Sequence, residues 1–212
     1  MLLHKMHLDL RCKEVRRDVA DPYEMHSTLC RAFSSSEKKC PPGTFLWRLE
    51  PETSTIGMPI IIVQSTVIPD WSRILVSDWF SEKPYPPIDV KEKLKLNLED
   101  LAIGRRFRFR LRANPSVCRK GKRFGLYKPE EQEEWLLQQG KLKGFSPETI
   151  HRSQELMLTG NRRADCTVKV FSVLYDGVLR VTEPKAFIEA VSIGIGHGKT
   201  MGLGLLSVVP VK

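Results

Sequence analysis

The sequence predicts an α+β protein with two tandem ferredoxin-like (βαββαβ, RRM-like) domains. In each half of the chain, segments of period two alternate with segments whose apolar residues recur every three or four positions, in an order close to β-α-β-β-α-β. The length of 212 residues also suits two domains of about 100 residues each, both able to bury a core. We expect the first domain over 1–90 and the second, with an additional strand, over 91–212.

The first half opens with a strand and a capped helix. Residues 1–10 alternate between apolar and polar side chains, as a half-buried strand does. Asp21 has the position of an N-cap, Pro22 that of the first helical residue, and Glu24 completes a D-x-x-E capping box. Apolar side chains at four-residue spacing over 25–33 then form the stripe that the helix buries.

Turn residues and alternation predict the remaining elements. After the first helix we expect a loop at 34–43, hairpin strands at 45–50 and 58–66, a short irregular helix at 69–80, and an edge strand or linker at 83–89. The second half should contain a strand at 106–114, a helix at 129–139, a strand at 149–158, a loop at 159–165, two strands joined by a type I′ turn at Asp176-Gly177, a helix at 184–194 and a strand at 203–211.

Positive charge is concentrated in one segment. The chain has 34 Lys and Arg against 25 Asp and Glu, a net charge of +9. Residues 105–128 hold ten of these basic residues and no acid, so the rest of the chain is close to neutral. Such a block typically contacts a polyanion such as nucleic acid, although a solvated basic face or a surface for an acidic partner protein has the same composition.

Composition argues against several classes of protein. Hydrophobic residues make up 41% and charged residues 28%, a globular rather than a disordered mixture. No run of about 18 apolar residues occurs, and the N-terminus lacks the h-region of a signal peptide, so we expect no membrane contact. The five cysteines are widely spaced and form no CxxC, which favours inert thiols in a reducing cytoplasm over a zinc site or disulfides.

The stretch IGIGHGKTMGLGLLS (193–207) invites comparison with phosphate-binding loops. It fits neither common template, because Ile193 stands where G-x-x-x-x-G-K-[ST] needs glycine, and Lys199 or Met201 stands where G-x-G-x-x-G does. It also follows a predicted helix, whereas those motifs open one. Two explanations stay open: the glycine amides hold phosphate oxygens beside Lys199, or the glycines permit a tight connection with positive φ.

Three motifs occur in order along the chain: PYEMH (22–26), RFRFRLRANP (106–115) and GIGHGKTMGLGLLSV (194–208). With them the sequence resembles the CasE family of CRISPR-associated endoribonucleases, the crRNA-processing subunit of the type I-E Cascade complex. The resemblance implies two ferredoxin-like domains and, as partners, CRISPR repeat RNA (the pre-crRNA hairpin and then the mature crRNA 3′ end) and other Cascade subunits. It also implies that the protein needs no cofactor and is a monomer in isolation.

RNA can be cleaved without a metal ion, because its own 2′-OH attacks the adjacent phosphorus once deprotonated. Clustered carboxylates for a metal-dependent nuclease are not evident, since the acids at 130–134 are explained by a helix dipole. Histidine titrates near neutrality, and of the five histidines only His26 has a phenol, Tyr23, three residues earlier on one helix face. The resemblance carries a tyrosine–histidine pair onto these same two residues.

The roles of the pair stay open at this point. His26 would be the general base or acid, and Tyr23 would orient or activate the 2′-OH or hydrogen-bond the phosphate. Their place near a helix N-terminus should attract phosphate and lower the pKa of His26. The alternative is that His26 is a polar first-turn residue and Tyr23 a packing residue.

The other RNA contacts are expected among basic and glycine residues. Arg162 and Arg163, in the predicted loop, would enter the groove of an RNA hairpin. Arg31, two turns beyond Tyr23, would support the transition-state charge or else be solvated. The complete expected set of RNA-binding residues is Arg31, Arg119, Lys120, Lys122, Arg162, Arg163, Gly196, Gly198 and Lys199, and no metal ligand is expected.

The leading hypothesis is a metal-independent endoribonuclease that cuts CRISPR precursor RNA within its repeat hairpins. It would leave a 5′-OH and a 2′,3′-cyclic or 3′-phosphate, and stay bound as a Cascade subunit. Three alternatives remain: a non-catalytic module that binds RNA hairpins, a metal-dependent nuclease, and a DNA-binding protein.

Overall fold

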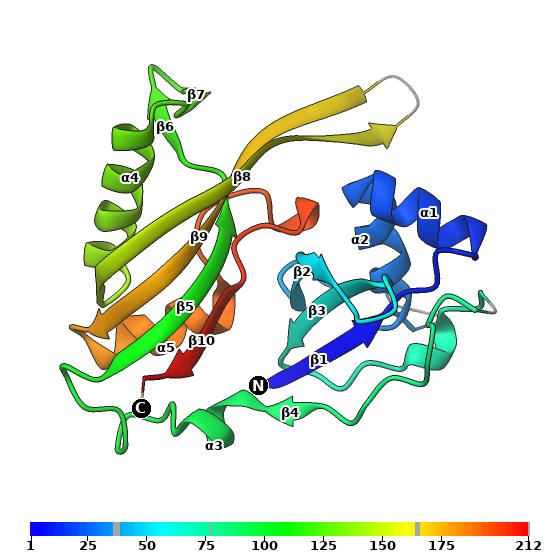
Figure 1. Ribbon diagram of the computed structural model, residues 1–212, viewed down its shortest axis with the longest axis horizontal. Coiled ribbons are helices and arrows are strands. Elements are labelled where there is room, and N and C mark those ends of the chain that lie inside the picture. The colour runs from blue at the N-terminus through cyan, green and yellow to red at the C-terminus, as the bar shows by residue number, and fades with distance from the viewer. Residues whose placement is uncertain (36–38, 77, 164–165, 212) are drawn as a thin grey trace. The chain divides into compact units, whose positions relative to one another are not determined.

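The computed structural model describes residues 1–35, 39–76, 78–163 and 166–211, without the side chains of 162 and 163 (Figure 1). The chain forms two compact units. The first unit comprises Met1–Val90, Thr159–Lys169 and Thr200–Gly202, and the second unit comprises Lys91–Leu158, Val170–Lys199 and Leu203–Lys212. No helix in these described ranges is long and apolar enough to cross a membrane.

The first unit contains a four-stranded antiparallel sheet with the order β2-β3-β1-β4. The predicted strands at 1–10, 45–50 and 58–66 are confirmed. Of the proline-rich segment 83–89, the last two residues form a short edge strand and the prolines lie before it. The strands are β1 (Leu2–His7), β2 (Phe45–Thr53), β3 (Pro59–Ser65) and β4 (Ile88–Asp89).

Two helices, α1 (Lys13–Ala20) and α2 (Pro22–Arg31), connect β1 to β2. The first was not expected, and the second is the predicted capped helix. Asp21 caps it, because its Oδ1 accepts the Tyr23 N–H at 2.9 Å. The predicted capping box is wrong, since Asp21 also ends α1 and its own N–H donates to the Arg17 carbonyl. Glu24 instead forms an ion pair with Arg17 at 3.2 Å.

Among the described residues of 69–80, which leave out 77, the only helical element is the 3₁₀ turn η1 (Trp71–Arg73), so the prediction of a helix across this segment is largely wrong. Beyond the turn, Phe80 makes a β-bridge with Leu8. Trp79 is fully buried there, and its indole Nε1 donates to Asp18 Oδ2 at 2.8 Å. Tertiary contacts to α1 and β1 therefore outweigh the local preference for a helix.

The second unit contains a second four-stranded sheet, with the order β10-β5-β9-β8, and a separate two-stranded sheet of β6 and β7 that was not expected. The expected helices are present. The elements are α3 (Val90–Leu94), β5 (Arg106–Ala113), β6 (Ser116–Arg119), β7 (Lys122–Gly125), α4 (Pro129–Leu142), β8 (Phe145–Arg163), β9 (Cys166–Val181), α5 (Pro184–Ile193), the 3₁₀ turn η2 (Lys199–Met201) and β10 (Leu206–Pro210).

Strand β5 carries the arginine alternation that the sequence predicts. Its residues Phe107, Phe109 and Leu111 are buried, as expected for the core face. The opposite face is only partly free for a ligand, because Arg110 binds Asp176 on β9 with 2.8 Å between Nε and Oδ1, and Arg112 is itself buried.

The predicted turn at Asp176-Gly177 is wrong, because both residues lie inside β9. Asp176 stands opposite Arg110, its ion-pair partner, in the register of β5 and β9. Gly177 admits a close approach of the neighbouring backbone, since a Cβ there would lie 2.0 Å from the Thr149 carbonyl oxygen. Strand β8 of the long β8–β9 hairpin in Figure 1 continues to Arg163, so a loop at 159–163 is also wrong, and 164–165 lie outside the described residues.

Candidate active site

A surface depression of about 460 Å³ in the first unit is lined by both members of the tyrosine–histidine pair. We call it the Tyr23–His26 depression. Its lining comes from α2, from the segment that follows α2, and from the tip of the β8–β9 hairpin. The lining residues are Tyr23, Glu24, His26, Ser27, Cys30, Ser34, Lys39, Cys40 and Asn161.

Tyr23 lies in the first turn of α2, where the Asp21 cap fixes its backbone. Its ring packs on Gly160 of β8, because a Cβ at that position would stand 2.6 Å from Tyr23 Cδ2. A real Cβ does not come so close to a ring carbon, so the absence of a side chain at Gly160 is what gives the phenol its place. Tyr23 is therefore both a packing residue and a wall of the depression.

His26 is half-buried, one turn further along α2. Its ring is inclined by 31° to that of Phe45, with 5.1 Å between the ring centroids. Its Nδ1 is buried and makes no hydrogen bond to any described residue, and its Nε2 lies 3.6 Å from the Cys30 Sγ. Burial lowers the pKa of His26 from its ordinary value of 6.5, so the imidazole is neutral at pH 7. The sequence predicted that the helix N-terminus would lower the pKa of His26. The pKa is indeed lowered, but the cause is burial.

Two free cysteines adjoin the histidine. Burial, and then the neighbouring thiol of Cys40, raise the pKa of Cys30 to about 12. The Cys30 thiol therefore keeps its proton at neutral pH and is able to donate it in a weak hydrogen bond to His26 Nε2. Neither cysteine was expected in the site, because an odd set of widely spaced thiols carries no signal of its own.

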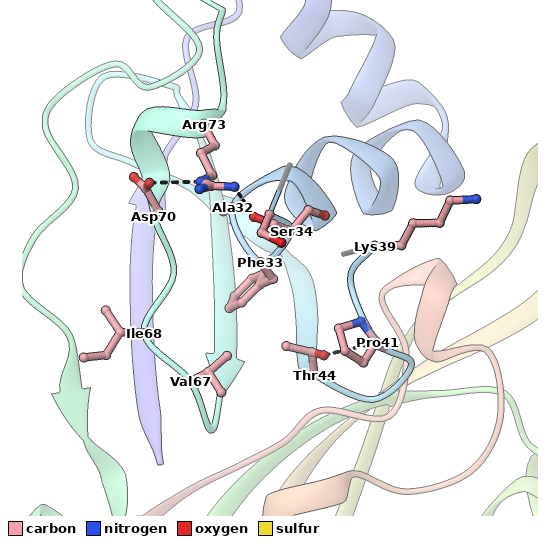
Figure 2. Close-up of a pocket in the computed structure, with 11 residues that line it drawn as sticks. Ala32, Phe33, Ser34, Lys39, Pro41, Thr44, Val67, Ile68, Asp70 and Arg73 are labelled. Carbon is pink, nitrogen blue, oxygen red and sulfur yellow. Dashed lines mark hydrogen bonds and ion pairs between the residues drawn. The ribbon is translucent and has the colours of Figure 1, made fainter. Parts of the chain in front are cut away.

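Lys39 supplies a positive charge to the Tyr23–His26 depression, and it was also missed. The run of lysines at 38–39 was a signal for it, although 36–38 lie outside the described residues. A second depression of about 460 Å³ shares Lys39 and Ser34 and is lined in part by apolar side chains. In Figure 2 the guanidinium of Arg73 lies between the Asp70 carboxylate and the Ser34 carbonyl, to both of which it donates.

The other expected RNA-binding residues are distributed over both units. Arg31 is the exposed last residue of α2 and is not part of the lining of the Tyr23–His26 depression. Arg119, Lys120 and Lys122 form the exposed turn of the β6–β7 hairpin, where Arg119 stands opposite Lys122. The side chains of Arg162 and Arg163 lie outside the described residues, so the prediction for them stays a prediction.

The glycine-rich stretch is a connection between α5 and β10 with repeated positive φ. Gly194, Gly196 and Gly198 have φ of 79°, 75° and 84°. Gly204 has φ of 90°, and a Cβ there would lie 2.7 Å from the Ile195 carbonyl oxygen. The conformational explanation of the glycines is therefore confirmed, and contact of their amides with a ligand stays a prediction.

Basic groups gather beside this stretch in the second unit. Burial, followed by the charge of Lys143, lowers the pKa of Lys199. Burial, followed by the charges of Arg123 and Lys199, lowers the pKa of His197. Mutual repulsion among these groups means that an anion placed among them would be stabilised. Lys143 was not expected here, because it lies far from Arg123 and Lys199 in sequence.

The described residues contain no group of three or more His, Cys, Asp and Glu side chains arranged to hold a metal ion. Within those residues, the lining of the Tyr23–His26 depression offers an imidazole, a phenol, two thiols, two serine hydroxyls, an amide, a carboxylate and an ammonium group. These groups are able to transfer protons and to bind an anion.

Comparison with known proteins gives one consistent result. Residues 1–210 match the profile of a family described as CRISPR associated protein. The chain is 36% identical over 223 residues to the CRISPR-associated endoribonuclease Cse3 of Thermus thermophilus, which covers 99% of this chain and 100% of the relative. It is 35% identical over 207 residues to the CRISPR system Cascade subunit CasE of Escherichia coli, covering 90% and 93% of the two chains.

A solved structure of the endoribonuclease Cse3 bound to a 19-nucleotide RNA has a TM-score of 0.83, with 34% identity, and covers 99% of this chain and 100% of that one. The fold and the family profile together define a CRISPR-associated protein. More particularly, the chain belongs to the Cse3/CasE family of CRISPR endoribonucleases of the type I-E Cascade. The resemblance stated from the sequence is confirmed.

Proposed function

We propose that this protein is a metal-independent endoribonuclease that cuts CRISPR precursor RNA within its repeat hairpins. The observation that carries the proposal is the Tyr23–His26 depression, which joins a neutral imidazole and a phenol in a chain 36% identical to an endoribonuclease. The relatives described above support endoribonuclease activity, but they do not bear on whether it needs a metal ion. The chemistry follows from the groups in the depression.

Neutral His26 is the group that takes up the proton of the attacking 2′-OH. Because Nδ1 is buried, Nε2 is the nitrogen that meets the RNA, and it becomes free when the Cys30 thiol turns away from it. The deprotonated 2′-oxygen attacks the adjacent phosphorus, the bond from phosphorus to the 5′-oxygen breaks, and the leaving oxygen takes a proton. The products are a 2′,3′-cyclic phosphate, which can open to a 3′-phosphate, and a 5′-OH.

Tyr23 and Lys39 act on the phosphate. A phenol at the wall of the depression can donate to a non-bridging oxygen or orient the 2′-OH, and an ammonium group stabilises the negative charge that builds up in the transition state. Arg31, on the same helix, would add a further positive charge if the RNA extends past the end of α2.

The second unit would hold the RNA hairpin by its backbone. The exposed residues Arg119, Lys120 and Lys122 and the basic group around Lys199 support this assignment, because A-form RNA is recognised mainly by shape, phosphate and 2′-OH. The amides of Gly196 and Gly198 would add contacts to phosphate oxygens. From the first unit, Arg162 and Arg163 would reach the groove of the RNA hairpin.

We also propose that the protein stays bound to the mature crRNA as a subunit of Cascade, as the name of its CasE relative supports. Each unit would be a variant of the ferredoxin-like fold. The two strand orders, β2-β3-β1-β4 and β10-β5-β9-β8, support this, because they are the 4-1-3-2 order that the split βαβ pattern produces. In the first unit the 3₁₀ turn η1 would take the place of the second helix.

One experiment tests the proposal. Repeat RNA is incubated with the protein in EDTA, beside the same RNA with a single 2′-deoxy nucleotide at the cleaved position. We expect cleavage of the first RNA only, and loss of cleavage with retained binding for His26→Ala. Activity that needs a divalent ion would indicate a metal-dependent nuclease. Binding without cleavage by the wild type would indicate a non-catalytic module, and preference for duplex DNA would indicate a DNA-binding protein.

A further inference from the structure

One carboxylate links the helix that carries the tyrosine–histidine pair to the tip of the β8–β9 hairpin. Asp21 Oδ1 accepts the Tyr23 N–H at 2.9 Å. Asp21 Oδ2 accepts both the backbone N–H and the side-chain Nδ2 of Asn161, each at 3.0 Å. Hydrogen bonds to an ionised carboxylate are about twice as strong as those between neutral groups. The residues lie 140 positions apart in sequence, so this contact is a specific tertiary feature of the first unit.

The orientation of the Asn161 amide is fixed by a second partner. Thr167, on the returning strand β9, donates its hydroxyl to Asn161 Oδ1 at 3.0 Å. With its oxygen engaged in this way, the amide presents Nδ2 to Asp21. The hydrogen bonds therefore run in one sequence from Thr167 through Asn161 and Asp21 to the backbone of Tyr23.

The residue before Asn161 contacts the Tyr23 ring itself. A Cβ on Gly160 would stand 2.6 Å from Tyr23 Cδ2 and 3.1 Å from the sulfur of Met201. The bonds from Asn161 and the ring contact at Gly160 thus fix both the backbone and the side chain of Tyr23 relative to the hairpin tip. Asn161 also lines the Tyr23–His26 depression.

We propose that Asn161 is a positioning residue for RNA cleavage, acting through Asp21 on Tyr23. The proposal rests on the endoribonuclease function proposed above. Asn161 holds the first turn of α2 where Tyr23 meets the reacting phosphate. Its loss leaves the basic residues of the second unit in place, so it lowers the rate of the chemical step without weakening the hold on the RNA hairpin.

The Asp21→Asn variant breaks the link to Asn161 but keeps the helix cap. Asparagine caps a helix about as well as aspartate does, so the bond to the Tyr23 N–H is kept. At Oδ2, however, an amide NH₂ would replace the acceptor and face the two donors of Asn161. Asn161→Ala removes the side-chain bond from the other side and keeps the backbone one. Thr167→Val removes only the group that orients the amide.

The test is single-turnover cleavage of repeat hairpin RNA, measured with the Kd for the same RNA. We expect Asp21→Asn and Asn161→Ala each to lower the rate constant about ten- to a hundredfold, the cost of a small misplacement of a reacting group. The Kd should stay at the wild-type value. Thr167→Val should give a smaller loss in the same direction, and the double variant of Asp21 and Asn161 should lose little more than Asp21→Asn alone.

Asp70→Asn is the matched control. Asp70 also caps a helical turn, since its Oδ1 accepts the Ser72 N–H at 3.2 Å and its Oδ2 accepts from Arg73. We expect this variant to cleave at the wild-type rate. Wild-type cleavage by Asn161→Ala would overturn the proposal, and so would a rate loss that is accounted for by a weaker Kd, which would make Asn161 a binding residue.

Amide exchange gives a readout that does not depend on the reaction. The backbone N–H of Asn161 should be protected in the wild type and exchange faster in Asp21→Asn, while the N–H of Tyr23 stays protected. Unchanged exchange at Asn161 would overturn the link itself. If the link is found but the wild type cuts no RNA, the endoribonuclease function fails and with it the assignment of Asn161 to that reaction.

Discussion

The imidazole of His26 and the thiol of Cys30 lie one turn apart on α2, with 3.6 Å between Nε2 and Sγ. The thiol keeps its proton at neutral pH, because its pKa is raised to about 12. The imidazole carries no extra proton at pH 7, because burial lowers its pKa. Each group thus adds to the desolvation of the other, and the sulfur covers the nitrogen that we assign to the reaction.

Replacing Cys30 by alanine should raise the pKa of His26 toward its ordinary value of 6.5. The smaller side chain admits water beside Nε2, and hydration favours the charged imidazolium. The NMR titration of the His26 Cε1 proton measures this shift. Cys12→Ala serves as the control, because Cys12 is also a free, half-buried cysteine but bonds Glu14 instead. An unchanged titration in Cys30→Ala would show that the sulfur does not limit hydration of the ring.

The free energy of unfolding should fall as the pH is lowered through about 6.5. Burial lowers the pKa of both His4 and His26, so the unfolded chain binds protons in a range where the folded chain does not. Stability therefore rises with pH across that window and is fully present above it. Urea unfolding at roughly pH 5 and pH 7.5 measures the difference, and His26→Ala should remove part of it. A pH dependence unaffected by this substitution would assign it wholly to other groups.

Gly202→Ala should destabilise the first unit more than Gly57→Ala does. Both glycines have positive φ, 75° and 78°, so both substitutions incur about 1 kcal/mol or more of backbone strain. At Gly57 the added methyl meets nothing within 4 Å, whereas at Gly202 it would lie 2.9 Å from Trp47 Cζ3. Urea unfolding of the two variants isolates the cost of the clash, since the strain is common to both. Equal losses would mean that the Trp47 ring moves aside freely.

Neutralising the turn of the β6–β7 hairpin should weaken RNA binding in a salt-dependent way. With Arg119, Lys120 and Lys122 all changed to alanine, the Kd for the hairpin should rise at low salt. Its dependence on salt should become less steep by about 0.7–0.9 for each phosphate that the protein no longer neutralises, because fewer counterions are released. The cleavage rate at saturating protein should stay unchanged. Lys185→Ala, at an exposed lysine elsewhere in the second unit, is the control; equal slopes for the two variants would contradict the assignment.

Local signals were sufficient for much of the fold. The cap at Asp21 is satisfied by Tyr23, two residues away. The alternation of Phe107, Phe109 and Leu111 predicts which face of β5 is buried, although the partner across that face, such as Phe187, is distant in sequence. The errors arose where a distant partner decides. Asp176-Gly177 has the composition of a turn, but its ion pair with Arg110 keeps it within a strand.

The same distinction between local signals and distant partners explains which residues of the Tyr23–His26 depression could be predicted. Tyr23 and His26 lie on one helix and were recognisable by their spacing together with the family resemblance. Asn161 and Cys40 reach the same depression from other segments, and nothing in their local sequence points to α2. Lys39 is intermediate, because a run of lysines marked the segment but not the place to which it folds.

The order in which the chain is synthesised gives the composition of the first unit a further consequence. Gly160 and Asn161 complete the surroundings of Tyr23, and Gly202 covers Trp47, yet all three leave the ribosome long after α2. A nascent chain that ends before residue 160 therefore lacks both the Gly160 contact to the Tyr23 ring and the hydrogen bonds from Asn161 to Asp21. The surroundings of Tyr23 and the cover over Trp47 are therefore completed only by segments that are synthesised long after α2.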